Sequence, residues 1–120
     1  MVTAERKAIE SQYTGRCTVY EYQSVKDPET KITTKQEIPV LMDQPCRLSF
    51  KTITSTSPTD GTATITQAVK LFIAPEIAIK PGSKITVTQN GATADYQRSG
   101  QPAVYTNHQE IVLELFEGWA

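Results

Sequence analysis

Few side chains in this sequence carry the reactive groups from which catalytic or metal sites are built. The chain has two cysteines, Cys17 and Cys46, and one histidine, His108. The cysteines do not form a CxxC pair and no histidine-rich segment accompanies them, so local spacing offers neither a structural zinc site nor a dithiol redox motif. A Cys17–Cys46 disulfide is compatible with the count. Because each cysteine lies in an apolar strand pattern and no signal peptide precedes them, we expect buried thiols in a reducing compartment.

The remaining acids and bases are better explained by their positions than by catalysis. No nucleophile motif accompanies His108, so a hydrogen-bonded structural or interface histidine is predicted. Glu110 and Glu114 share the polar face of a predicted strand, which indicates a solvated surface rather than an acid–base pair. Glycine-rich phosphate or dinucleotide loops are absent from the sequence. We therefore predict a protein that is not an enzyme and needs no cofactor or metal.

Charge further narrows the possible partners. Twelve basic and thirteen acidic residues give a formal net charge of −1, without the basic excess typical of nucleic-acid binders. Weak or transient contact with DNA stays open, because four basic residues can line one surface: Arg16, Arg47, Lys51 and Lys70. No apolar run is long enough to span a bilayer, so no membrane partner is expected.

The elements that position these residues are mainly predicted strands. The length of 120 residues and the hydrophobic content of 38% predict one domain over residues 1–120. Seventeen residues are threonine, whose branched side chain favours extended structure. The one helical candidate is a short helix over residues 3–13, with Thr3 as its N-cap and Gly15 ending it in a left-handed conformation.

After this helix, alternation with a period of two predicts six or seven short antiparallel strands. Asp27-Pro28 and Asn90-Gly91 are the clearest turn signals between them. The predicted strands are Arg16–Val25, Lys31–Met42, Cys46–Lys51, Thr64–Ala74, Lys84–Thr88, Ala92–Arg98 and His108–Phe116. Strands at this spacing, without intervening helices, indicate a small β-barrel or a sandwich. The predicted core comprises Val19, Leu48, Phe50, Val69, Leu71, Ile85, Val87, Ile111, Leu113 and Leu115.

One segment interrupts the alternation and is predicted to be a long flexible loop over residues 52–63. It is polar and small, and loops of this length are usually functional. Its candidate functional residues are Thr52, Ile53, Thr54, Ser55, Thr56, Ser57, Pro58, Thr59, Asp60, Gly61 and Thr62.

Aromatic residues on the outer strand faces form a second candidate site. Either the helix and a crossover segment cover them, or other chains bury them, since aromatic residues are enriched at interfaces. These possible interface residues are Tyr20, Tyr22, Phe72, Phe116 and Trp119.

Three segments carry a resemblance to a known family: Cys46–Lys51, Lys80–Val87 and Ser99–Ile111. Together with the order of strands and turns, which extends over nearly the whole chain, they resemble the small head-tail connector proteins of long-tailed phages and Gram-positive prophages. These proteins are also called head-closure, head-completion or stopper proteins.

The resemblance implies a small β-barrel that forms a ring beneath the portal and its adaptor, closes the channel after DNA packaging and presents a surface to the tail or tail-terminator protein. It implies location in the virion, after assembly in the bacterial host cytoplasm. By position, residues 52–63 match the family's channel loop. The alternative is an OB-like barrel that binds single-stranded nucleic acid or another protein, with Tyr20, Tyr22 and Tyr96 clustered on an exposed face.

Overall fold

Six of the seven strands close into a ring, and the remaining two-residue strand, Ala103–Val104, flanks it. The computed structural model describes residues 3–56, 61 and 63–119. The elements are α1 (Ala4–Glu10), β1 (Gly15–Lys26), β2 (Thr33–Thr56), β3 (Ala63–Ile73), β4 (Lys84–Gln89), β5 (Ala92–Arg98), β6 (Ala103–Val104) and β7 (Gln109–Leu115). The strand order is β3-β2-β1-β4-β5-β7-β6, and an additional β3–β7 pairing completes the barrel. The mainly β, antiparallel fold with a short N-terminal helix is thus confirmed.

Strand β2 is a single strand of 24 residues where the sequence predicted two. Its pairing with β1 shifts register twice, between Cys17 and Val19 and between Val19 and Tyr20. Each shift places one extra residue on β2, as in a β-bulge, so the strand bends without ending. Asp43 takes a positive φ of 53° within this region. Pro39 lies directly after the second shift, opposite Tyr20.

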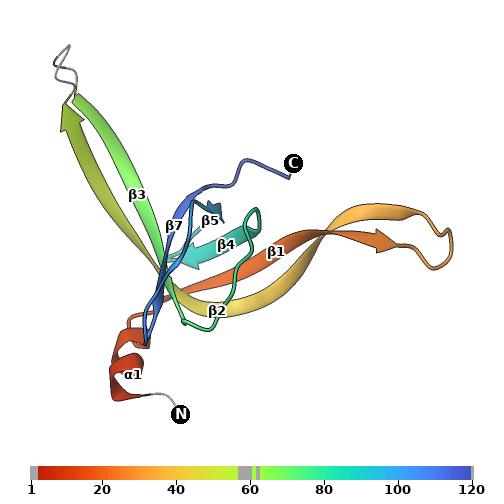
Figure 1. Cartoon of the computed structure of the whole chain (residues 1–120), viewed down its shortest axis with the longest axis horizontal. Helices are drawn as coiled ribbons and strands as arrows, with labels where there is room; N and C mark the ends of the chain where they lie inside the picture. The colour runs from red at the N-terminus through yellow and green to blue at the C-terminus, as the bar shows by residue number, and fades with distance from the viewer. Residues whose placement is uncertain (1–2, 57–60, 62, 120) are drawn as a thin grey trace.

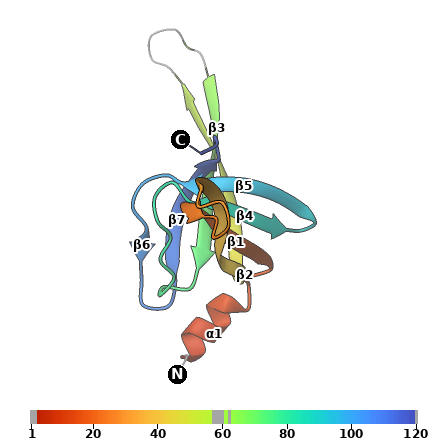
Figure 2. The same cartoon turned by 90° about the vertical axis from the view of Figure 1, so that its right-hand side faces the viewer.

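Two hairpins extend beyond the barrel in different directions (Figures 1 and 2). β4 pairs with β1 only as far as Tyr20, so residues 21–38 continue as a two-stranded ribbon, the first arm. β7 pairs with β3 only as far as Val69, so the described part of residues 51–68 forms the second arm.

The second arm corrects the prediction of a long loop over residues 52–63. Residues 52–56 belong to β2, and the register runs from Thr52↔Gln67 to Thr56↔Ala63. Threonine favours extended structure, but the small polar residues of this segment lack the apolar–polar alternation by which strands are recognised in a sequence. Positions 57–60 and 62 of the predicted loop lie outside the described residues.

The barrel interior contains most of the predicted core. The buried residues of that predicted set are Val19, Leu48, Leu71, Ile85, Val87, Ile111 and Leu113, and they are joined by Cys17, Cys46, Ile73, Ile79 and Tyr96. Val69 packs against this cluster. The prediction was wrong for Phe50 and Leu115, which are 51% and 68% exposed. Both have the inward parity, but they lie where β2 and β7 reach the end of the barrel and no strand layer covers them.

Gly15 has a different role from the one predicted. α1 does begin after the N-cap Thr3, whose Oγ1 accepts a hydrogen bond from Arg6 N at 3.1 Å, but the helix already ends at Glu10. Gly15 is the buried first residue of β1. A Cβ there would lie 3.0 Å from Gln89 Oε1 and 3.2 Å from the Cys46 carbonyl oxygen. Close approach of three strands, rather than a left-handed turn, therefore requires glycine.

Candidate functional site

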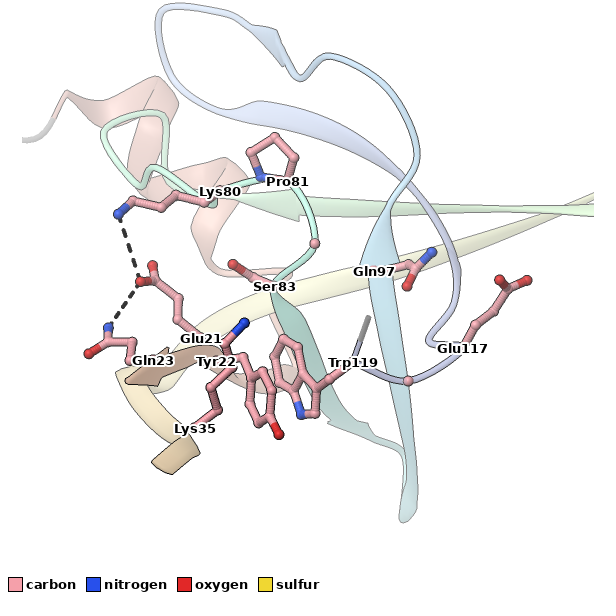
Figure 3. A pocket seen from close by; sticks show the side chains of 12 residues that line it. Glu21, Tyr22, Gln23, Lys35, Lys80, Pro81, Ser83, Gln97, Glu117 and Trp119 are labelled. Carbon is pink, nitrogen blue, oxygen red and sulfur yellow. Dashed lines mark hydrogen bonds and ion pairs between the residues drawn. The ribbon is translucent and has the colours of Figure 1, made fainter. Parts of the chain in front are cut away.

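A groove lies where the first arm leaves the barrel (Figure 3). Its volume is about 770 Å³, and its walls come from the base of the arm, the turn before β4, strand β5 and the segment after β7. Glu21, Lys35, Lys80 and Glu117 place charges of both signs along it. Lys80 Nζ lies 3.8 Å from Glu21 Oε1, an ion pair across the groove between an exposed lysine and a half-buried glutamate. A mixed and open surface of this kind suits contact with a protein better than enclosure of a small molecule.

Trp119 and Tyr22 form the aromatic centre of this groove. Figure 3 shows their rings stacked. The ring centroids are 5.0 Å apart and the interplanar angle is 6°. Phe116 meets Trp119 edge-on at 4.9 Å, and Trp119 Nε1 donates to Glu37 Oε1 at 3.3 Å. The segment after β7 is thereby fastened to the first arm. Aromatic pairs of this geometry contribute about 0.5–1.5 kcal/mol beyond their buried area.

Tyr20 extends the same surface toward the barrel. Lys84 Nζ lies 4.7 Å from the Tyr20 ring centroid, and Lys84 also forms an ion pair with Glu37. Lys35 Nζ lies 5.8 Å from the Tyr22 ring. Sequence reasoning missed these lysines and Glu37. Glu37 pairs with Tyr22 and Lys84 pairs with Tyr20 across neighbouring strands. These pairs can be found in the sequence only if the strand register is known, and the two bulges shift that register.

The structure therefore brings together four of the five predicted interface residues and separates the fifth. The Phe72 ring stacks on the His108 ring with centroids 6.0 Å apart, and the Tyr105 ring stacks on the same histidine at 4.9 Å. Phe72 also lines a cavity of about 290 Å³, together with Ala8 and Ile9 of α1. This part of the prediction resolves into packing of the helix onto the barrel.

His108 is hydrogen-bonded, as the sequence predicted. Its Nε2 lies 3.0 Å from Glu110 Oε2, and Lys70 Nζ lies 3.4 Å from Glu110 Oε1. The hydrogen bond with His108, assisted by Lys70, holds the pKa of the Glu110 carboxyl below its usual range. Glu110 is thus half-buried and paired, whereas Glu114 is exposed and accepts a hydrogen bond from Gln97 Nε2 at 2.7 Å.

The two cysteines are free thiols inside the barrel, 1% and 0% exposed. A hydrogen bond with Cys46, together with burial, raises the pKa of the Cys17 thiol. A thiol in this state is a poor nucleophile. Among the residues that the structure describes, no group of three His, Cys, Asp or Glu side chains is arranged to hold a metal ion.

The aromatic platform expected for an OB-like nucleic-acid binder does not form. Tyr96 is 7% exposed and belongs to the core, so it cannot stack bases beside Tyr20 and Tyr22. The register places Arg16, Arg47, Lys51 and Lys70 on the outer face of β1, β2 and β3, so these four basic residues share one surface.

The seven-residue α1, the one helix in the described part of the chain, is too short to cross a membrane.

Comparison with known proteins points to one solved structure. The chain is similar to the protein xkdH of the phage-like element PBSX from Bacillus subtilis, with a TM-score of 0.51 and 15% sequence identity. The match covers 85% of this chain and 93% of that chain. No protein-family model and no curated protein matches the sequence. At this level of identity the likeness shows a shared fold.

Proposed function

We propose that this protein is a non-catalytic structural subunit of a phage or prophage particle, which forms a ring at the head-tail interface. In this role it closes the portal channel after DNA packaging and provides the surface to which the tail attaches. The observation that carries the proposal is the closed barrel with two projecting arms, in a fold shared with a phage-like element protein over 85% of this chain.

The architecture suits a ring subunit because it separates a fixed body from elements that reach outward. The barrel is enclosed on all sides by strand pairing, which gives each copy a fixed shape. The arms leave strand edges free beyond Tyr20 and Val69, and such edges readily pair with another chain. We assign the channel-closing role to the second arm, which contains the residues that match the family's channel loop.

The direct test is assembly on its template. The full chain is mixed with purified portal–adaptor assemblies of a Gram-positive phage and examined by electron microscopy. We expect an additional ring beneath the adaptor, with a narrowed channel. A chain that stays monomeric and leaves the assemblies unchanged in all buffers tested contradicts the proposal.

A matched pair of shortened variants separates the roles of the two arms. Replacing residues 54–65 with Asn-Gly joins the register pair Ile53↔Thr66, and replacing residues 24–35 joins Gln23↔Gln36. Asn-Gly already makes the tight β4–β5 turn in this chain, with φ of 53° and 77°. We expect the variant with the shortened second arm to form rings whose channel stays open to DNA. Any rings formed by the variant with the shortened first arm should still close the channel. Equal closure by both variants removes the second arm from the mechanism.

A further inference from the structure

The outer surface of the barrel carries opposite charges on opposite sides. The basic face consists of Arg16, Arg47, Lys51 and Lys70 on β1, β2 and β3. The acidic face consists of Asp95 on β5, Glu114 on β7 and Glu117 just after β7. Around the closed ring of strands, β5 is three strands away from β2 in either direction, so the centres of these faces lie on opposite sides of the barrel.

The pairing registers show that the residues of each face lie together. Lys70 pairs directly with Ser49, which lies between Arg47 and Lys51 on β2. Glu114 pairs directly with Gln97, two residues after Asp95 on the same side of β5. All of these charged side chains are exposed. Residues at such register positions are neighbours on one face of a sheet.

Most of these charges are not neutralised within the chain. Across residues 3–56, 61 and 63–119, Lys70 is the one member of either face that forms an ion pair, with Glu110. Arg47 donates to the neutral Gln12 amide oxygen at 2.9 Å, and Asp95 accepts from the Thr86 hydroxyl at 2.7 Å. Lys84 lies near the acidic face, but Glu37 already pairs with it.

We propose that, in the ring assigned under the proposed function, the basic face of one copy packs against the acidic face of the next. A contact between two different faces is heterologous, and repeated by rotation it closes a ring. Opposite placement on the barrel is the geometry that such a contact needs. Charge complementarity also orients the copies and disfavours a two-fold dimer, because like faces repel.

The test uses charge reversal in the full chain on the portal–adaptor template. The variants are Arg47→Glu with Lys51→Glu, Asp95→Lys with Glu114→Lys, and all four together. With Lys70 counted as neutralised by Glu110, the first variant changes the basic face from +3 to −1 and the second changes the acidic face from −3 to +1, so either reversal alone makes both faces alike in sign. We expect ring yield to fall about tenfold or more. The four-fold variant exchanges the signs at a lower charge and should recover part of the ring yield. Raised salt should weaken the wild-type ring, since exposed charges are screened.

A matched control carries two reversals outside both faces and both arms, Glu5→Lys with Lys7→Glu on α1, and should assemble like the wild type. Circular dichroism and thermal unfolding verify folding. If a reversed variant does not fold, Arg47→Gln with Lys51→Gln replaces it and should lower ring yield less steeply.

The outcomes distinguish this inference from the proposed function. Rings that form equally well after reversal of either face, or that are not recovered in the four-fold variant, overturn the face-to-face contact and leave the ring role intact. A wild-type chain that forms no ring overturns both. Titration with a short DNA duplex covers the competing use of the basic face: if reversal abolishes DNA binding without changing ring yield, that face serves DNA and the inference is wrong.

Discussion

The barrel and the arms are made from the same strands but are stabilised differently. β1 is buried at Cys17 and Val19, where it pairs with both β2 and β4, and at the adjoining Gly15. At positions 21–26, where β2 is its one neighbouring strand, no residue is buried. The radius of gyration is 17.7 Å, against about 14 Å for a compact chain of this length. Extension of the arms accounts for the excess.

This difference shows which part of the sequence determines stability and which is free to determine contacts. Burial of apolar side chains stabilises the barrel, whereas an isolated two-stranded hairpin is marginal in water. The arms persist because their strands continue directly into the barrel. Substitutions in the arms should therefore alter binding at little cost to the fold.

The largest expected effect contrasts one residue from each region. Leu71 is 0% exposed in the barrel, and Leu71→Ala should lower the free energy of unfolding by about 2–5 kcal/mol through lost burial and a cavity. Ile32, at 60% exposed near the tip of the first arm, should tolerate Ile32→Ser within about 0.5 kcal/mol. Urea unfolding followed by circular dichroism measures both, and equal losses would show that the arm contributes to the core.

A second comparison concerns two glycines: Gly15, which is closely packed between strands, and Gly91, which lies in a tight turn. Gly15→Ala should destabilise the barrel by about 1–3 kcal/mol, because the new Cβ meets Gln89 Oε1 and two backbone carbonyls within 3.3 Å. Gly91 has open space around it but a φ of 77°, so Gly91→Ala should cost about 1–2 kcal/mol from backbone strain. Crystal structures of the variants discriminate the two causes: neighbouring strands should shift only around residue 15. An unshifted Gly15→Ala variant of wild-type stability refutes the contact argument.

The third prediction concerns the segment that fastens the barrel to the first arm. Tyr22→Ala removes the stacking partner of Trp119 and should cost about 0.5–1.5 kcal/mol. Trp119 is the one tryptophan in the sequence, so its fluorescence reports this contact directly. We expect a red-shifted emission in the folded variant. Val25→Ala, farther along the same arm, serves as control and should leave the spectrum unchanged.

The smallest expected effect is a pH dependence located on the barrel. The folded pKa of Glu110 lies below its ordinary value of 4.5, chiefly because of the hydrogen bond with His108. The contribution of this carboxylate is therefore present above about pH 4.5 and is lost as the pH falls through the lower folded pKa. Glu110→Gln should reduce the decline in stability over that acidic range. An identical decline in wild type and variant would show that Glu110 does not take part.

The contrast between the regions also explains what the sequence could predict. Strands β4, β5 and β7 were located nearly residue for residue, since their inward positions are apolar and Asn90-Gly91 marks a turn. Residues 52–56 were predicted as part of a loop because they are threonines, a serine and one isoleucine, without the apolar–polar alternation that reveals a strand; the partner strand from Thr64 was predicted. Phe50 and Leu115 were misplaced because parity shows which way a side chain points but not where the barrel ends.

The candidate site was predicted in its components but not in its arrangement. Tyr20, Tyr22, Phe72 and Phe116 were identified from the alternation of inward and outward strand positions, and Trp119 from its position after the last strand. Four of these five aromatic residues lie on one surface. Their contacts with Lys35 and Glu37 depend on the register of β1 against β2, which two bulges shift, and the contact with Lys84 depends on the register of β1 against β4. Phe72 also points outward from its strand, but it lies beside β7 and α1. It is therefore separated from the other aromatic residues by its position around the barrel.

The uninterrupted course of β2 has a mechanical consequence. This strand runs from the turn of the first arm through the barrel wall and into the second arm, so both arms share one covalent backbone without an intervening loop. Two strands hydrogen-bonded along their length resist stretching far more than a flexible linker does. A load applied to the tip of one arm is therefore transmitted along β2 to the base of the other, with the bulges beside Val19 as the points of greatest compliance.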